Sequence, residues 1–244
     1  MQKITAAILI IGNEILSGRT QDINIQYIAT KLSEKGIVLG EARIIPDIKS
    51  SIIDAISDLR AKYTYVFTTG GIGPTHDDIT SDAIAASFGV KLIKHDEAYR
   101  RLKEYYSSTN REMNLRSEQM AYIPEGATLI DNSATTAPGF ILENVYVMAG
   151  VPYIMQAMMD FVLPTLQSGL TIESRTLSLF IGESLIANEM EAIETKYPDI
   201  SVGSYPSMSN ASSITSVVLR SNNIIELDKA FNEFSNIMAK MKVI

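Results

Sequence analysis

Short continuous apolar runs alternate along the chain with stretches whose apolar residues recur at helical spacing. The runs predict buried strands of a parallel sheet at residues 4–11, 37–45 and 63–69. The periodic stretches predict helices with buried positions at Ile25, Ile28, Leu32, Ile52, Ile56 and Leu59. Further strands are expected at 128–130, 139–142 and 145–148, and further helices after Thr80, Asp96 and Val151. This alternation predicts a doubly wound α/β domain with a mostly parallel sheet over residues 1–168.

The pattern changes at Ser168 and Gly169. A strand, a helix, two antiparallel strands and a final helix are expected after this point, at 176–181, 183–197, 201–205, 214–220 and 227–238. They predict a small α+β (βαββα) domain over residues 169–244, with a KH-like layout. RNA or a partner chain is a conceivable ligand for such a module. A KH domain clamps RNA with a GXXG turn, and none occurs between residues 170 and 244, so this function is the least favoured.

Composition excludes several classes of function. Hydrophobic residues make up 46% of the 244 residues and charged residues 20%, which is ordinary for a globular protein. The net charge of −7 argues against nucleic acid or an anionic membrane as the main partner. The absence of cysteine excludes disulfides, thiolate nucleophiles and cysteine-ligated zinc. The apolar run near the N-terminus is too short to span a membrane and lacks a cleavage site, so we expect a cytoplasmic protein.

The strongest chemical signal is the glycine-rich stretch that follows the third strand. Gly70, Gly71 and Gly73 let the chain approach an anion closely, and Thr80 is expected to cap a helix whose N-terminus adds positive charge. The same glycines are also explained by a tight connection between a strand and a helix. The stretch therefore predicts a phosphate-binding turn in which Pro74 and Thr75 also take part.

Two adjacent carboxylates, Asp77 and Asp78, follow the glycines. We expect them to be the catalytic carboxylates and metal ligands of the site. Adjacent residues point in different directions, so one should bind the ion directly, with Asp78 favoured, and the other should lie behind it. A helix-cap role for one of them is the alternative. Glu14, in the turn after the first strand, is the third candidate catalytic carboxylate.

Other polar residues near predicted strand ends are candidate ligands of the substrate. They are Gly12, Asn13, Ser17, Asp22, Thr75 and Thr80. Asn13 is equally well explained as a turn residue and Asp22 as a helix cap. His76 lies within the same stretch, but two histidines in all exclude a histidine-rich metal site.

Four ordered motifs carry a resemblance to a known family. They are residues 10–18 with Asp22-Ile23-Asn24, residues 68–80, Ala137-Pro138-Gly139-Phe140, and Ala149-Gly150-Val151-Pro152. Over nearly its whole length the chain resembles the N-terminal part of the competence/damage-inducible CinA family, which carries a molybdopterin-binding (MoCF)-type domain. Many relatives have proline where this chain has Ala149. The resemblance implies a three-layer fold whose ligand, at the carboxyl ends of the strands, is bordered by Pro138, Gly139, Gly150 and Pro152. Turn chemistry alone also explains these four residues.

The resemblance implies two functions that share one cavity. The leading expectation is a pyrophosphatase that depends on a divalent metal, Mg²⁺ or a transition metal, and hydrolyses ADP-ribose or FAD. The alternative is a protein that binds or adenylylates molybdopterin. The family's larger C-terminal deamidase domain has no counterpart in these residues, so deamidase activity is not expected. Relatives of the fold associate, and by analogy we expect a homo-oligomer.

Overall fold

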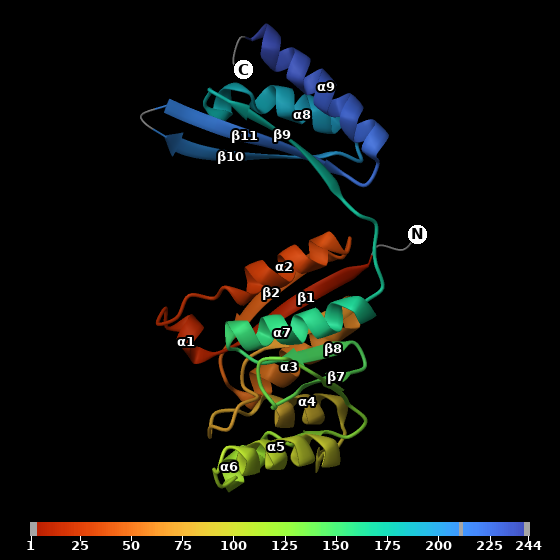
Figure 1. Cartoon of the computed structure of the whole chain (residues 1–244). Helices are drawn as coiled ribbons and strands as arrows, with labels where there is room; N and C mark the ends of the chain where they lie inside the picture. Colours follow the sequence, from red (N-terminus) through yellow and green to blue (C-terminus); the bar gives the residue numbers. More distant parts are fainter. Residues whose placement is uncertain (1–3, 210–211, 242–244) are drawn as a thin grey trace. The chain divides into compact units, whose positions relative to one another are not determined.

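The computed structural model describes residues 4–209 and 212–241. The chain divides into two compact units, Met1–Gly169 and Leu170–Ile244, each with its own sheet (Figure 1). Within the described residues, no helix is long and apolar enough to cross a membrane.

The first unit is organised around one six-stranded sheet. Its strand order is β2-β1-β3-β8-β7-β6. The pairs β1–β2, β1–β3 and β3–β8 are parallel, whereas β7 is antiparallel to both of its neighbours. The strands are β1 (Thr5–Ile11), β2 (Val38–Ile45), β3 (Tyr65–Thr69), β6 (Thr128–Ile130), β7 (Gly139–Leu142) and β8 (Val145–Met148). The predicted mostly parallel sheet is confirmed.

Helices cover both faces of this sheet. Side chains of β1 alternate between the two faces. Ala6, Ile8 and Ile10 pack with α2 (Asn24–Glu34) and α7 (Pro152–Val162), which is followed by the short helix η1 (Leu163–Thr165). Ala7, Leu9 and Ile11 belong to the core on the other face, with α3 (Lys49–Lys62), α4 (Thr80–Phe88) and α5 (Asp96–Ser108). Figure 1 shows these layers, and they confirm the three-layer α/β architecture.

The chain order creates a topological switch point between β1 and β3. From β1 the chain passes through α2 to β2 on one side, and through α3 it returns to β3 on the other side of β1. The carboxyl ends of β1 and β3 therefore lead in opposite directions and leave a crevice, the place where open α/β sheets bind ligands. The short helix α1 (Asn13–Leu16) follows β1 here, and the glycine-rich turn follows β3.

A small excursion between α4 and β6 differs from the prediction. Within residues 107–121, helical structure is limited to the end of α5 and the five residues of α6 (Leu115–Gln119). β4 (Leu92–Lys94) pairs antiparallel with β5 (Tyr122–Pro124) in a separate two-stranded sheet. β5 was not predicted, because three residues are too few to show a period.

The second unit has the predicted βαββα order. Its antiparallel sheet has the order β10-β11-β9, and its core includes Leu179, Ile193, Val217 and Phe234. The strands are β9 (Glu173–Leu179), β10 (Ser201–Ser209) and β11 (Ser212–Ser221), and the last helix is α9 (Ile224–Lys240). β9 begins three residues before the predicted strand. The single helix predicted at 183–197 is instead η2 (Glu183–Leu185) followed by α8 (Ala187–Lys196).

Candidate functional site

A cavity of about 820 Å³ opens at the carboxyl ends of β1, β3 and β8. The predicted site residues that line it are Glu14, Gly70, Gly71, Gly73, Pro74, Thr75, Asp77, Asp78, Gly150 and Pro152. Those that do not line it are Gly12, Asn13, Ser17, Asp22, Thr80, Pro138 and Gly139. The switch point therefore brings together the residues after β3 with part of the loops after β1 and β8.

The backbone of the turn after β3 depends on its first two glycines. Gly70 has φ 104°, and a Cβ there would lie 2.1 Å from the carbonyl oxygen of Ile11. Gly71 has φ 69°, and a Cβ there would lie 2.2 Å from Thr80 Oγ1. Both positions combine a left-handed backbone with a close approach, which only glycine allows. The tight-connection explanation is thus supported for this pair.

The amide groups of the turn are only partly free to bind an anion. The Gly70 N–H donates to the Met148 carbonyl oxygen at 3.2 Å, so this amide is already bonded within the protein. Within residues 4–209 and 212–241, the amides of Gly71 and Gly73 have no acceptor. The Gly70 amide is bonded within the sheet, because the backbone of Gly70 still continues beside β8.

Thr80 does not cap α4. It is the first residue of the helix, its side chain is fully buried, and its backbone N–H donates to the Gly71 carbonyl oxygen at 2.9 Å. This bond draws Thr80 behind the glycine turn and away from the cavity. The first turn of α4 instead borders a second cavity of about 460 Å³, which Ser81 and Asp82 also line. Thr80 therefore does not line the main cavity, and the start of α4 faces the second cavity, which Gly73, Thr75 and Asp78 also line.

Thr75 links the two aspartates. Its hydroxyl group is hydrogen-bonded to Asp77 Oδ1 and lies 2.6 Å from Asp78 Oδ2, and its N–H donates to the same Asp78 oxygen at 2.7 Å. The expectation that the adjacent carboxylates diverge was wrong, because the turn closed by the Asp78 N–H and the Thr75 carbonyl oxygen curls both toward one hydroxyl. A hydroxyl has one proton, so it donates to only one carboxylate at a time.

Hydrogen bonds shift the pKa of Asp77. The Thr75 hydroxyl, together with the backbone N–H of Asp77 itself, lowers the pKa of Asp77 below its ordinary value. The Asp77 side chain is 63% exposed and the His76 side chain is 84% exposed. His76 Nδ1 lies 3.9 Å from Asp77 Oδ1. Among the described residues there is no cluster of three or more acidic, histidine or cysteine side chains that could hold a metal ion. A metal here would depend on the aspartate pair and on ligands from outside the chain.

α1 presents Glu14 to the cavity. The Glu14 carboxylate folds back over Gly12, where Oε1 lies 2.6 Å from the position that a Cβ would take. A side chain at position 12 would displace this flexible carboxylate from its place over the backbone. Asn13 and Ser17 serve the backbone of the helix, since the Asn13 N–H donates to Asp47 Oδ2 at 2.8 Å and the Ser17 hydroxyl donates to the Glu14 carbonyl oxygen at 3.2 Å.

Asp47 was missed as a site residue. Asp47 follows β2, holds α1 through Asn13 and lines the cavity. Asp22, in contrast, lies one residue before the N-cap Ile23 and accepts a hydrogen bond from the Ile25 N–H at 2.9 Å, so it stabilises the start of α2 without being the cap residue itself. A contact across 34 positions, such as the one between Asn13 and Asp47, leaves no local signal in the sequence.

The loop after β8 enters the site through its backbone. The first turn of α7 has no side-chain cap, and no acceptor for the amides of Val151 and Tyr153 exists in the described part of the chain. A helix N-terminus of this kind attracts anions. Gly150 packs closely on Gly70, since a Cβ on Gly150 would lie 3.2 Å from the Gly70 Cα. Gly150 and Pro152 both line the cavity.

Pro138 and Gly139 do not reach the cavity. Both are buried, and a Cβ on Gly139 would lie 2.4 Å from the Val147 carbonyl oxygen, so this glycine serves the pairing of β7 with β8. Packing and turn chemistry therefore explain these two residues. The preceding residues 134–137 line the cavity instead, together with Leu102, Tyr105 and Tyr106 of α5.

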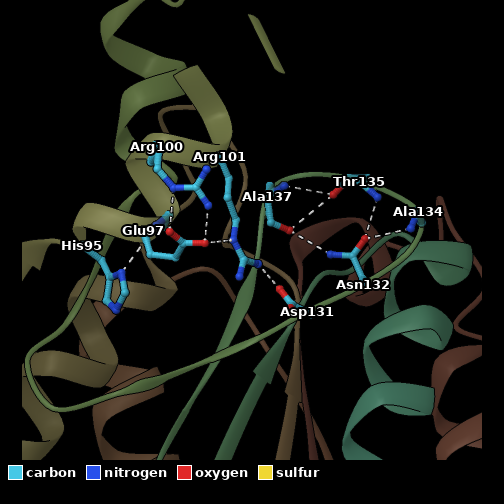
Figure 2. Close-up of polar contacts among 10 residues, drawn as sticks. His95, Glu97, Arg100, Arg101, Asp131, Asn132, Ala134, Thr135 and Ala137 are labelled. Carbon is cyan, nitrogen blue, oxygen red and sulfur yellow. Dashed lines mark hydrogen bonds and ion pairs between the residues drawn. The ribbon is translucent and has the colours of Figure 1, made fainter. Parts of the chain in front are cut away.

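Figure 2 shows how α5 and the loop of residues 131–137 are joined. Arg101 of α5 forms an ion pair with Asp131 at the start of the loop, and Glu97 accepts a hydrogen bond from Arg101 Nε at 2.6 Å. The neighbouring guanidinium groups of Arg100 and Arg101 lower the pKa of Glu97 to about 2. Neither α5 nor this loop was predicted as part of the site, because the contacts that bring them together span 30 positions.

Two family models match the chain. Residues 7–168 match the model described as "Probable molybdopterin binding domain", and residues 171–244 match the model described as "FAD synthase, middle domain". The first match covers the whole cavity. The second covers the small α+β unit.

Named relatives agree with the first match. A "CinA-like protein" of Desulfosudis oleivorans is 36% identical over 81% of this chain and 51% of its own length, so the chain spans about half of that relative. A protein of Archaeoglobus fulgidus is 33% identical over 82% of this chain and 84% of its own length. The crystal structure of CinA from Thermoplasma acidophilum, described as of unknown function, superposes with a TM-score of 0.62 at 28% identity, over 67% of this chain and 98% of that one. The chain therefore belongs to the molybdopterin-binding (MoCF) domain family, in the group whose members are named CinA-like.

Proposed function

We propose that this protein is a divalent-metal-dependent nucleotide pyrophosphatase that hydrolyses the phosphoanhydride of ADP-ribose or FAD. The observation that carries the proposal is the Thr75 hydroxyl shared by the Asp77 and Asp78 carboxylates in the wall of an 820 Å³ cavity. The two carboxylates share one hydroxyl group and therefore keep negative charge that a cation can neutralise. The cavity volume lies within the usual range for small-molecule sites.

The aspartate pair fits a hard divalent cation. Mg²⁺ at phosphate sites is commonly held by one or two carboxylates, with water and substrate phosphate oxygens as the other ligands. Asp77 and Asp78 would hold the ion, and their number matches this requirement without a third side chain. When bound, the ion supplies a Lewis acid that polarises a phosphoryl oxygen and makes a bound water more acidic.

Backbone groups of the chain would bind the phosphates. The free amides of Gly71 and Gly73 and the uncapped N-terminus of α7 border the same cavity. Donors fixed in this way stabilise negative charge that develops on a phosphoryl group, because they need no reorganisation during the reaction. Glu14 is the proposed general base, which accepts a proton from the attacking water.

The apolar part of the cavity would bind the heterocycle. Leu102, Tyr105 and Tyr106 line it, and the two tyrosine rings meet edge to face with centroids 5.5 Å apart. Aromatic side chains stack on flat heterocycles, whatever substituents the heterocycle carries. The match of residues 171–244 to an FAD synthase domain supports a flavin nucleotide as one candidate substrate.

A second candidate function is binding or adenylylation of molybdopterin in the same cavity. The description of the family model that matches residues 7–168 favours it. Titration calorimetry with molybdopterin separates the two functions. Tight binding of the pterin by a protein that releases no AMP from ADP-ribose or FAD would favour the second.

The proposed reaction is tested by incubating the purified protein with ADP-ribose or FAD and Mg²⁺, Mn²⁺, Co²⁺ or Ni²⁺. Release of AMP, separated by chromatography, is the expected result. The Asp78→Asn variant should release it far more slowly. Asp82→Asn is the matched control, because Asp82 is an exposed aspartate that pairs with Lys49 and does not line the main cavity. Intact substrates with all four metals would refute the proposal.

A further inference from the structure

The loop of residues 131–137 holds its own shape. The Asn132 side chain donates from Nδ2 to the Ala137 carbonyl oxygen at 3.0 Å, and its Oδ1 accepts from the amides of Ala134 and Thr135 at 3.1 and 2.6 Å (Figure 2). The Ala137 N–H donates to the Thr135 hydroxyl at 3.2 Å. These bonds fix the loop internally, so its remaining freedom is its position relative to α5.

The ion pair between Arg101 and Asp131 joins the loop to α5. Glu97, one turn earlier on α5, accepts a hydrogen bond from Arg101 and orients its guanidinium group, which pairs with Asp131 of the loop (Figure 2). No other ion pair joins α5 to residues 131–137 in the part of the chain described. Neither Arg101 nor Asp131 lines the cavity, whereas residues on both sides of their contact, Tyr105 and Thr135 among them, do.

We propose that Arg101 and Asp131 are positioning residues that set the width of the cavity between α5 and the 131–137 loop for the flat heterocycle of a nucleotide. The ligand class rests on the proposed function. A ring that is held between two walls loses contact when one wall moves, because dispersion attraction falls steeply with separation. The phosphate-binding backbone lies on other elements, after β3 and β8, and does not depend on this ion pair.

A purely structural role would have a different signature. The side chains of Arg101 and Asp131 are 31% and 44% exposed, and exposed ion pairs of this kind contribute about 0–1 kcal/mol to stability. Loss of the pair should therefore leave the unit folded while the loop shifts. Binding of a ligand that contains the heterocycle should weaken, and binding of the same ligand without it should not.

The experiment is titration calorimetry of the full chain with AMP and with ribose 5-phosphate. Arg101→Met should weaken AMP binding about fivefold and leave the affinity for ribose 5-phosphate unchanged. Arg100→Met is the matched control, since Arg100 binds the same Glu97 and also Glu104 but does not reach the loop. Both affinities should keep their wild-type values in this control. Arg101→Lys should recover part of the lost AMP affinity.

A second variant approaches the pair from the loop. Asp131→Asn should lower AMP affinity to the same extent as Arg101→Met, and the double variant should show no further loss, because both single changes remove one interaction. The Asp131→Asn variant also allows the inference to be tested if Arg101→Met does not fold.

Three results would overturn the inference. They are wild-type AMP affinity in both single variants, an equal loss of AMP and ribose 5-phosphate affinity, and a wild-type protein that binds ribose 5-phosphate as tightly as AMP. Hydrolysis is not part of the readout. A protein that binds AMP with the predicted pattern but leaves ADP-ribose intact would contradict the proposed function and support this inference.

Discussion

Asn24 at the start of α2 donates a hydrogen bond from Nδ2 to the Gly150 carbonyl oxygen at 2.9 Å. The two residues follow β1 and β8, which are not neighbours, because β3 lies between them in the sheet. Asn24 is only 4% exposed whereas Gly150 is exposed, so this bond spans the end of β3 at the border between the core and the solvent. It fixes the turn that leads into the N-terminus of α7, one wall of the cavity.

Asn24→Ala should lower both stability and ligand affinity. The Gly150 carbonyl oxygen loses its partner, and because Gly150 itself is exposed we expect the net loss of one hydrogen bond, about 0.5–1.5 kcal/mol in the free energy of unfolding. AMP binding should weaken as well, because the α7 turn lines the cavity. Denaturant unfolding and calorimetry measure the two effects.

Asn144→Ala is the control for this change. Its side-chain amide also donates to backbone carbonyl oxygens, those of Arg60 and Tyr63, at the opposite end of β8 from the cavity. It should lose stability without losing AMP affinity. If Asn24→Ala behaves in the same way, the Asn24 contact does not shape the site.

Gly71→Ala tests the packing of the glycine turn. The substitution places a Cβ 2.2 Å from Thr80 Oγ1 at φ 69°, so strain and overlap add, and we expect a loss of about 3 kcal/mol or more. Gly89→Ala separates the two terms, since Gly89 has φ 67° with nothing within 4 Å of a Cβ. It should cost about 1 kcal/mol. Equal losses in chemical denaturation would show that Thr80 does not limit position 71.

Thr75→Val should change how the site titrates. The hydrogen bond from the Thr75 hydroxyl is the main cause of the lowered pKa of Asp77, so the valine variant should raise this pKa toward the ordinary value of about 3.9. With the pKa lowered in the folded state, the stability that ionised Asp77 contributes is present above that ordinary value. It is lost as pH falls through the lower folded value. In the variant this pH-dependent contribution should shrink, because the folded and unfolded pKa values of Asp77 converge.

The measurement is a carboxyl NMR titration, together with Mg²⁺ affinity, which should fall about tenfold when the shared hydroxyl is removed. Thr30→Val serves as the control, because the Thr30 hydroxyl bonds only the Gln26 carbonyl oxygen on α2. An Asp77 titration that is unchanged in Thr75→Val would contradict the assigned cause.

The sequence predicts the sheet well because buried parallel strands are continuous apolar runs. β1, β3 and β8 are visible for this reason, and so are the glycines that end β3. Short elements without a period were not predictable, as β5 shows. The start of α4 was also predicted wrongly. Threonine is a common cap residue, but the hydrogen bond from the Thr80 N–H to the Gly71 carbonyl oxygen places Thr80 in the first turn of α4.

The site was predictable only where its residues follow a strand directly. Gly71, Asp77 and Asp78 belong to one local motif, and Glu14 stands just after β1. Asp47, Arg101 and Asp131 are joined to the site by contacts across 30 or more positions, and their neighbours in sequence carry no motif. Pro138 and Gly139 show the converse error, because a strong motif there serves strand pairing.

The central claim is that the aspartate pair on Thr75 supports metal-dependent cleavage of a phosphoanhydride. The most direct measurement is the rate of AMP release from ADP-ribose with Mg²⁺ or Mn²⁺, compared among wild type, Asp78→Asn and the control Asp82→Asn. We predict release by wild type and the control, its loss on addition of EDTA, and a rate about 100-fold lower in Asp78→Asn. Equal rates in wild type and Asp78→Asn, or release that persists in EDTA, would contradict the account.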